Sequence, residues 1–181
     1  KRLTVKYCRF SNTGRHAIHC NAEAQWTQLL YNRIVSTASA TANAILLNDG
    51  CDDSVIHGNI IEDAGDSGIE VVSSERVIIS SNRVHNAAIT GISMDSCHDG
   101  TITANIIEGE CSTAGIENAM SNPVAVTGNS VFNVTGRPVS CSGSGQVTVI
   151  TGNTFRDTSK GVQLLSSGPG SIVSGNVFDN V

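Results

Sequence analysis

The chain has 181 residues and a formal net charge of −5, and its length fits one domain with a buried core. The acidic balance argues against a nucleic-acid partner, because a surface that binds phosphates needs an excess of clustered Lys and Arg. No apolar run approaches the ~18 residues of a membrane-spanning helix, so we expect no insertion into a membrane. Aromatic residues are scarce at 4%, whereas small and β-branched residues are abundant, which is typical of a β-rich domain.

An asparagine recurs along the chain inside the same apolar frame, as in "VIISSNRV", "TITANII" and "AVTGNSV". Successive copies are 23 to 27 residues apart, and Cys8 takes the equivalent place at the front. The recurrent positions are Asn32, Asn59, Asn82, Asn105, Asn129, Asn153 and Asn176. A fixed period of this size indicates a repeat architecture.

Three short apolar segments follow one another in every repeat, separated by turn sequences such as "EDAGDSG" and "DTSKG". None of the segments is long enough for an ordinary helix. In chain order, the first segment is marked by Phe10, Ile34, Ile61, Val84, Ile107, Val131, Phe155 and Phe178. The second is marked by Ile18, Ile45, Ile69, Ile92, Ile116, Val139 and Val162, and the third, such as Val77–Ile79, leads back to the next Asn.

Three brief strands in each repeat predict an all-β parallel β-helix (solenoid) of about seven to eight coils, in which each coil pairs only with its neighbours. A corner at the same height in every coil leaves backbone groups that no strand partner can satisfy. An Asn amide offers donors and an acceptor, tolerates unusual backbone angles and can bond the Asn one coil away, so we predict an asparagine ladder. We expect a single domain over residues 1–181 that is a segment of a longer protein.

With this repeat, the chain resembles the pectate-lyase-like right-handed parallel β-helix superfamily over essentially its whole length. The resemblance implies a carbohydrate partner, because the superfamily includes pectate and alginate lyases, polygalacturonases, C5-epimerases and phage tailspike depolymerases. The rival architecture is a leucine-rich repeat, which has a similar period and a recurrent Asn but needs Leu at several fixed positions. Leu is rare here, and Val, Ile and Phe occupy these positions.

The six cysteines are expected to be free thiols. Cys20 and Cys141 fall at the same inward position of repeats five coils apart, about 24 Å at strand spacing, whereas a disulfide needs Cα atoms within ~7 Å. Cys51, Cys97 and Cys111 fall in turns, at unmatched offsets or in non-neighbouring coils. Free thiols fit folding in a reducing cytoplasm, and no C-x-x-C pair suggests a zinc site.

The candidate catalytic residues are three carboxylates on one outward face. After the second apolar position the outward column reads His19, Leu46, Glu70, Ser93, Glu117, Ser140 and Gln163, and Asp95 lies two residues beyond Ser93. By coil and residue spacing, Asp95 lies about 8 Å from Glu70 and from Glu117. Inverting glycosidases hold their two carboxyls ~6.5–9.5 Å apart, so the spacing is compatible with hydrolysis. The alternative is that these acids only solvate the surface.

Substrate contacts are assigned to His19 and Ser93 in this column, and to His85, Trp26 and Tyr31 elsewhere. His85 should stack between Glu62 and Glu108, where it could act as an acid or only compensate the charge of a ladder of side chains. Trp26 and Tyr31 flank the longest coil, and an outward aromatic ring there would stack on a sugar. The alternative for Trp26 is packing under a turn.

The resemblance also leaves lyase and epimerase chemistry open, with Ca²⁺ as a possible cofactor. Asp95, Asp99 and Glu117 would form an oxygen-rich patch for such an ion, and we otherwise expect no cofactor and no resident metal. Lyases and epimerases need a base and a group that neutralises the uronate carboxylate. The basic candidates do not gather on the acidic face, which favours hydrolysis; they are Arg83, His85, His98 and Lys160.

Two classes of function follow. The first is a phage tailspike-type depolymerase that hydrolyses a bacterial surface polysaccharide, with Asp95 and Glu117 as base and acid and Glu70 as a modulator. The second is a non-catalytic solenoid that binds glycan or forms a rigid part of a fibre. We expect a location on a virion tail or outside the cell, and a homotrimer or larger assembly, because several outward residues are apolar. These residues are Val35, Leu46, Ile60, Val72 and Ile106.

Overall fold

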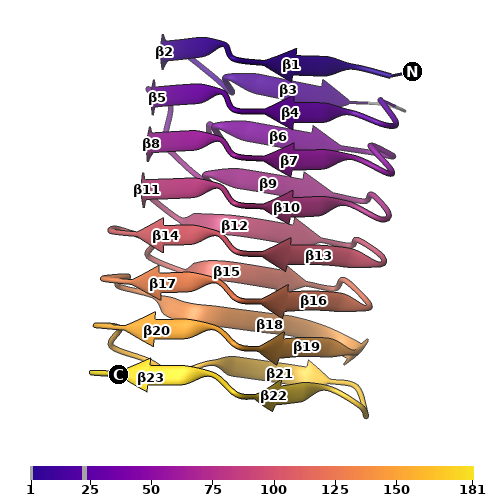
Figure 1. The fold of residues 1–181 in the computed structure, drawn as a ribbon, viewed down its shortest axis with the longest axis vertical. Coiled ribbons are helices and arrows are strands. Elements are labelled where there is room, and N and C mark those ends of the chain that lie inside the picture. The colour runs from indigo at the N-terminus through magenta and orange to yellow at the C-terminus, as the bar shows by residue number, and fades with distance from the viewer. Residues whose placement is uncertain (1, 22–23) are drawn as a thin grey trace.

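The computed structural model describes residues 2–21 and 24–181, which wind into a stack of three-stranded coils (Figure 1). Sheet A contains β1 (Thr4–Lys6), β4 (Gln28–Leu30), β7 (Val55–His57), β10 (Ile78–Ser80), β13 (Gly100–Thr103), β16 (Val124–Thr127), β19 (Thr148–Thr151) and β22 (Ile172–Ser174). Sheet B contains β2 (Arg9–Thr13), β5 (Arg33–Thr37), β8 (Ile60–Ala64), β11 (Arg83–Ala87), β14 (Ile106–Glu108), β17 (Ser130–Phe132), β20 (Thr154–Arg156) and β23 (Val177–Asp179). Sheet C contains β3 (Ile18–Asn21), β6 (Ile45–Asn48), β9 (Ile69–Val72), β12 (Thr90–Asp95), β15 (Ala114–Ala119), β18 (Arg137–Gln146) and β21 (Gln163–Ser167).

Every neighbouring pair of strands is parallel and joins residues one repeat apart. Val84, for example, pairs with Ile61 in the coil before it and with Ile107 in the coil after it, and all three side chains are fully buried. The apolar positions read from the repeat therefore form vertical stacks inside the coils. The predicted parallel β-helix of seven to eight coils is confirmed, since sheets A and B have eight strands and sheet C has seven.

No helix in the described part of the chain is long and apolar enough to cross a membrane.

The recurrent asparagines form the predicted ladder at the corner between sheets A and B. The Nδ2 of Asn82 donates to the Oδ1 of Asn105 at 3.0 Å and to the carbonyl of Ile56 at 2.9 Å. The same Oδ1 of Asn105 also accepts the backbone N–H of Asn82 at 2.9 Å. This pattern runs from Asn32 to Asn176, and almost the whole column is buried. The ladder thereby satisfies backbone groups that the corner removes from the sheets.

A second ladder, which the repeat alignment missed, lies at the corner between sheets C and A. Its column reads Cys51, Ser74, Cys97 and Ser121, all buried. The backbone N–H of Cys51 donates to the Oγ of Ser74 at 3.1 Å, and that of Cys97 to the Oγ of Ser121 at 2.9 Å. Cys51 and Cys97 are thus at matched positions in non-neighbouring coils, with Ser74 between them. All six cysteines are free, as predicted, and burial raises the pKa of the Cys111 thiol to about 12.

Residues in the left-handed backbone region recur at two of the corners, in every coil at the first and in four coils at the second. At the corner between sheets A and B, φ is 54° to 67° in Tyr7, Tyr31, Gly58, Ser81, Ala104, Gly128, Gly152 and Gly175. At the corner between sheets C and A, φ is 53° to 59° in Trp26, Asp53, Arg76 and Asp99. A non-glycine residue in this region costs roughly 1–2 kcal/mol, and a bulky side chain there is unusual.

The outer face of sheet C is more covered than the sequence suggested. Leu46, predicted to be exposed, is buried at 9% exposure. It pairs with Glu70, and the long turn before β6 carries Asn43, whose amide bonds to the Glu70 carboxylate. The predicted exposure of Ile60 and Ile106 is confirmed at 41% and 42%.

Replacing Asn105 by Ala should destabilise the chain by about 3–5 kcal/mol, because two buried donors of Asn82 lose their acceptor and the Ile79 carbonyl and the Oδ1 of Asn129 lose a donor. Urea denaturation followed by circular dichroism measures this loss. Thr154→Ala, at an exposed position of β20, is the matched control and should change stability by less than about 0.5 kcal/mol. Equal effects of the two substitutions would contradict the role of the ladder.

Candidate functional site

Three carboxylates gather on the outer face of sheet C, as the repeat alignment predicted. Ser93 of β12 pairs with Glu70 of β9 on one side and with Glu117 of β15 on the other. The two Glu positions are therefore two coils apart, about 9–10 Å. Asp95 lies at the end of β12, where it pairs with Val72 and Ala119. One strand each of three consecutive coils thus supplies the candidate acids.

Glu70 and Glu117 are half-buried, and Ser93 between them is buried. Burial raises the pKa of the Glu117 carboxyl, and the charge of Asp95 raises it further, while a hydrogen bond from Thr90 at 3.3 Å lowers it. Burial likewise raises the pKa of Glu70, with further contributions from Asp66, Asp95 and Glu117. Both glutamates therefore hold a proton more tightly than an exposed carboxyl does.

Asn43 holds Glu70 in place, and sequence reasoning missed it. Its Nδ2 donates to the Oε2 of Glu70, and its Oδ1 accepts the backbone N–H of Ser67 at 3.0 Å. Its own backbone N–H donates to the Nδ1 of His16 at 3.0 Å, which requires that nitrogen to be unprotonated. Burial, with the nearby His19 and Arg15, lowers the pKa of His16 and so favours this state. The only sequence signal was an amide residue in the longest turn, two residues before β6.

The remaining predicted contacts are distributed over the molecule. Ser93 lies between the two glutamates, and His19 is exposed two coils from Glu70 in the same column, with its ring 5.2 Å from that of His16. Trp26 and Tyr31 lie at the two corners that bound β4, and they are 59% and 49% exposed. Trp26 therefore does not pack under a turn, but neither aromatic residue lies on the sheet C face.

His85 lies on sheet B, between Glu62 and Glu108 as predicted. Its Nδ1 is 3.7 Å from the Oε2 of Glu108, which Arg83 also approaches at 3.5 Å. Arg33 contacts Glu62 at 3.1 Å. The arrangement compensates charge along a column of side chains, and such exposed pairs contribute little to stability. His85 is not brought to the carboxylates of sheet C.

No three His, Cys, Asp or Glu side chains within residues 2–21 and 24–181 gather closely enough to hold a metal ion. Asp95, Asp99 and Glu117 accordingly do not form the oxygen-rich patch considered for Ca²⁺. Asp99 lies instead at the corner between sheets C and A, with φ of 54°.

The family model described as "right handed beta helix region" matches residues 43–181. The chain belongs to this right-handed β-helix family. Crystal structures of two mutants of the periplasmic alginate epimerase AlgG superpose on it with TM-scores of 0.77 and 0.68, at 12% identity, over 97% of this chain and 47% of theirs. The surface adhesin PfbA of Streptococcus pneumoniae superposes with a TM-score of 0.53, at 11% identity, over 96% of this chain and 59% of that one.

No curated protein sequence matches this β-helix. At such low identities the structural similarities show the fold alone, and the chain spans only about half of the epimerase structures.

Replacing both Glu70 and Glu117 by Gln should stabilise this β-helix relative to the parent as the pH rises. Both folded-state pKa values lie above the ordinary value of 4.5, so the native state binds these protons more tightly than the unfolded state. The stability that they contribute is present below this value and is lost as the pH rises through the raised pKa values. Thermal unfolding from about pH 4 to about pH 7 should show a growing difference. A constant difference would contradict the assignment.

Replacing Asn43 by Ala should raise the pKa of Glu70 further, because the hydrogen bond from Asn43 lowers it. NMR titration of the side-chain carboxyl carbons measures this shift. The pKa of Glu117, which Asn43 does not contact, is the internal control, and a parallel shift of both would indicate a general change of the fold.

Proposed function

We propose that this β-helix hydrolyses glycosidic bonds of a polysaccharide on the outer face of sheet C, with Glu117 as general acid and Asp95 as general base. The observation that supports this most strongly is the half-buried Glu117, whose pKa is raised by burial and by Asp95 on the neighbouring strand. A general acid has to carry its proton near the working pH, which an exposed carboxyl does not.

The spacing of the pair supports an inverting reaction. Asp95 and Glu117 lie on adjacent strands and two residues apart along them, which places their Cα atoms about 8 Å from each other. Two outward side chains at this Cα separation can hold their carboxyl groups within the ~6.5–9.5 Å that leaves room for a water between them. Glu117 would protonate the leaving glycosidic oxygen while Asp95 takes a proton from the attacking water. Glu70, whose pKa is raised by the charges of both acids, would act as a modulator of the pair.

The charge of the site favours an uncharged sugar at the cleaved bond. The charges of Asp66, Asp95 and Glu117 all raise the pKa of Glu70, and the described residues provide no ion pair to any of these four carboxylates. A uronate carboxylate bound there would need a neutralising cation, and the basic candidates Arg83 and His85 lie on sheet B. For this reason we favour hydrolysis over lyase or epimerase chemistry, although AlgG, with the same fold, is an alginate epimerase.

A setting outside the cytoplasm and an assembly of several chains belong to the proposal. AlgG is periplasmic and PfbA is a surface adhesin, and Ile60, Ile78 and Ile106 are exposed on the sides of the coils. Packing against further chains would cover these side chains. The narrower assignment to a homotrimeric phage tailspike on a virion has support only from the resemblance of the repeat.

Asp95→Asn and Glu117→Gln should each reduce the release of reducing ends from a polysaccharide by about 10²–10⁴-fold, while circular dichroism shows that the fold is retained. The assay uses a panel of neutral and acidic bacterial surface polysaccharides, and mass spectrometry identifies the new chain ends. Glu110→Gln, an exposed acid outside sheet C, is the matched control and should remain active. Unsaturated ends would indicate a lyase, and no release from any polysaccharide would favour a binding function.

A further inference from the structure

The three Tyr and Trp residues of the chain all lie beside sheet A in the first two coils. Trp26 precedes β4 and Tyr31 follows it, so they are separated by about 16 Å along the strand. Tyr7 follows β1, and its ring stacks on that of Tyr31 at 5.7 Å with an angle of 7° between the planes. All three are exposed, Tyr7 at 73%. Exposed amphipathic rings of this kind are typical of surfaces that bind a ligand.

All three rings also stand at backbone positions that suit them poorly. Tyr7, Tyr31 and Trp26 have φ of 57°, 54° and 59°, in the left-handed region. Later coils place mostly glycine or small residues at the first corner, and Asp53, Arg76 and Asp99 at the second. The backbone conformation does not favour a large ring at such a position, so another property of the ring explains its presence. Residues with a strained backbone are common at ligand sites.

A hollow of about 340 Å³ opens beside Trp26, lined by Arg2, Trp26, Gln28 and Asp53. This volume is at the lower end of the ~300–1,000 Å³ typical of ligand pockets. The lining combines an aromatic ring with a cation, an amide and a carboxylate, which together can stack on a sugar ring and bond its substituents.

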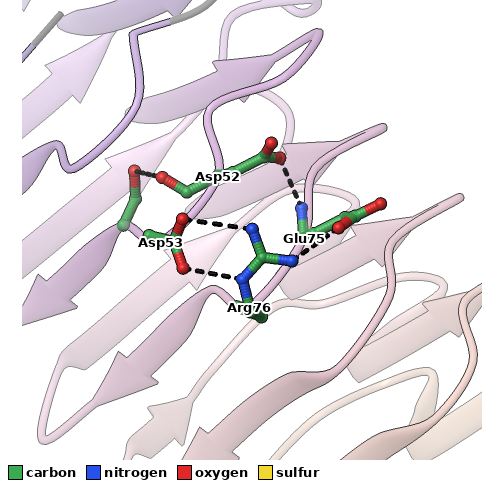
Figure 2. A network of polar contacts seen from close by, with 5 residues as sticks. Asp52, Asp53, Glu75 and Arg76 are labelled. Carbon is green, nitrogen blue, oxygen red and sulfur yellow. Dashed lines mark hydrogen bonds and ion pairs between the residues drawn. The ribbon is translucent and has the colours of Figure 1, made fainter.

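The carboxylate in the hollow is fixed by the next coil. Figure 2 shows Arg76 donating to both oxygens of Asp53, at 2.7 and 3.1 Å, and to Glu75 at 2.6 Å. Asp52 accepts the backbone N–H of Glu75 at 2.8 Å, which ties the two turns together. Asp53 is therefore held in position to accept hydrogen bonds from hydroxyl groups, and Arg76 in the next coil compensates its charge.

The charge of this end of the molecule is opposite to that of the rest. Residues 1–48 contain six of the eleven Lys and Arg but only one of the sixteen Asp and Glu, so they carry +5 and residues 49–181 carry −10. Arg2 and Lys6 are exposed here, and the Nζ of Lys6 lies 5.9 Å from the centre of the Tyr7 ring. At the hollow itself Arg2 supplies a cation that can pair with an anionic group of a ligand, and the carboxylate of Asp53 is compensated by Arg76.

We propose that the hollow at Trp26 binds a carboxylate-bearing sugar of a polysaccharide, with Trp26 stacked on the ring, Arg2 on the carboxylate and Asp53 on hydroxyl groups. The stacked Tyr7 and Tyr31, at the other end of β4, belong to the same aromatic surface along sheet A. This site rests on the proposed function only in taking a polysaccharide as ligand. It lies off the carboxylates of sheet C and anchors an acidic part of the chain without cleaving it.

Trp26 is the only tryptophan in the sequence, so its fluorescence reports on the hollow directly. The probes are hexameric oligomannuronate, hexameric oligogalacturonate and sialyllactose, with neutral maltohexaose as control. At least one carboxylated probe should change the emission saturably, with about tenfold weaker half-saturation for maltohexaose and weaker binding at high salt. No change with any carboxylated probe, or an equal response to maltohexaose, would overturn the proposal.

Substitutions locate the site. Arg2→Ala should weaken binding by about tenfold, whereas Lys160→Ala, which removes the same charge from an exposed turn far along the chain, should leave it unchanged. Trp26→Asn, which tolerates the left-handed backbone, should abolish binding measured by calorimetry while the thermal unfolding midpoint is retained. Equal weakening by Arg2→Ala and Lys160→Ala would refute the site.

Glu117→Gln separates the two proposals. It should lose hydrolysis and keep the Trp26 response. Hydrolysis without a Trp26 fluorescence response would contradict only the proposed binding at the hollow. A Trp26 fluorescence response without hydrolysis by the parent would contradict only the proposed function.

Discussion

In-register parallel stacking of the coils is the constraint on which the rest of this structure depends. Because residues one repeat apart pair directly, the neighbours of each side chain are set by the equivalent positions in the coils on either side. Apolar residues then form continuous stacks inside, as Val84 does with Ile61 and Ile107. Buried Asn82 and Asn105 satisfy each other and the corner backbone through the same vertical contact. A residue type that suits one coil therefore tends to suit the next.

The same stacking brings like charges together, and the faces of the molecule deal with this differently. On sheet B, Glu108 is approached by Arg83 and His85. At the corner between sheets C and A, Arg76 compensates Asp53. On sheet C, in contrast, Glu70 and the other carboxylates are separated only by neutral residues and have no cationic partner in the described ranges. Stacked charges are compensated on the other faces but not on sheet C, and a functional site is expected at such an exception.

Much of this architecture could be predicted from the sequence, because position within the repeat is also position within the coil. The period predicted the ladder, the strand order and the column through Glu70, Ser93 and Glu117. Features without a period were missed: Asn43 reaches Glu70 from the one long turn, which has no equivalent in other coils. Burial of Leu46 was missed as well, because alternation along a strand assigns a side chain to a face but does not say what covers that face.

The carboxylates lie on β9, β12 and β15, which are the middle three of the seven strands of sheet C. Their immediate environment is therefore supplied by only a few coils, and each coil contacts only its neighbours. Whole repeats could be gained or lost on either side during evolution, lengthening or shortening the rod, while the geometry among Glu70, Asp95 and Glu117 stayed the same. The length of the rod and the chemistry of the carboxylates are thus separable properties of this molecule, and selection could change one without changing the other.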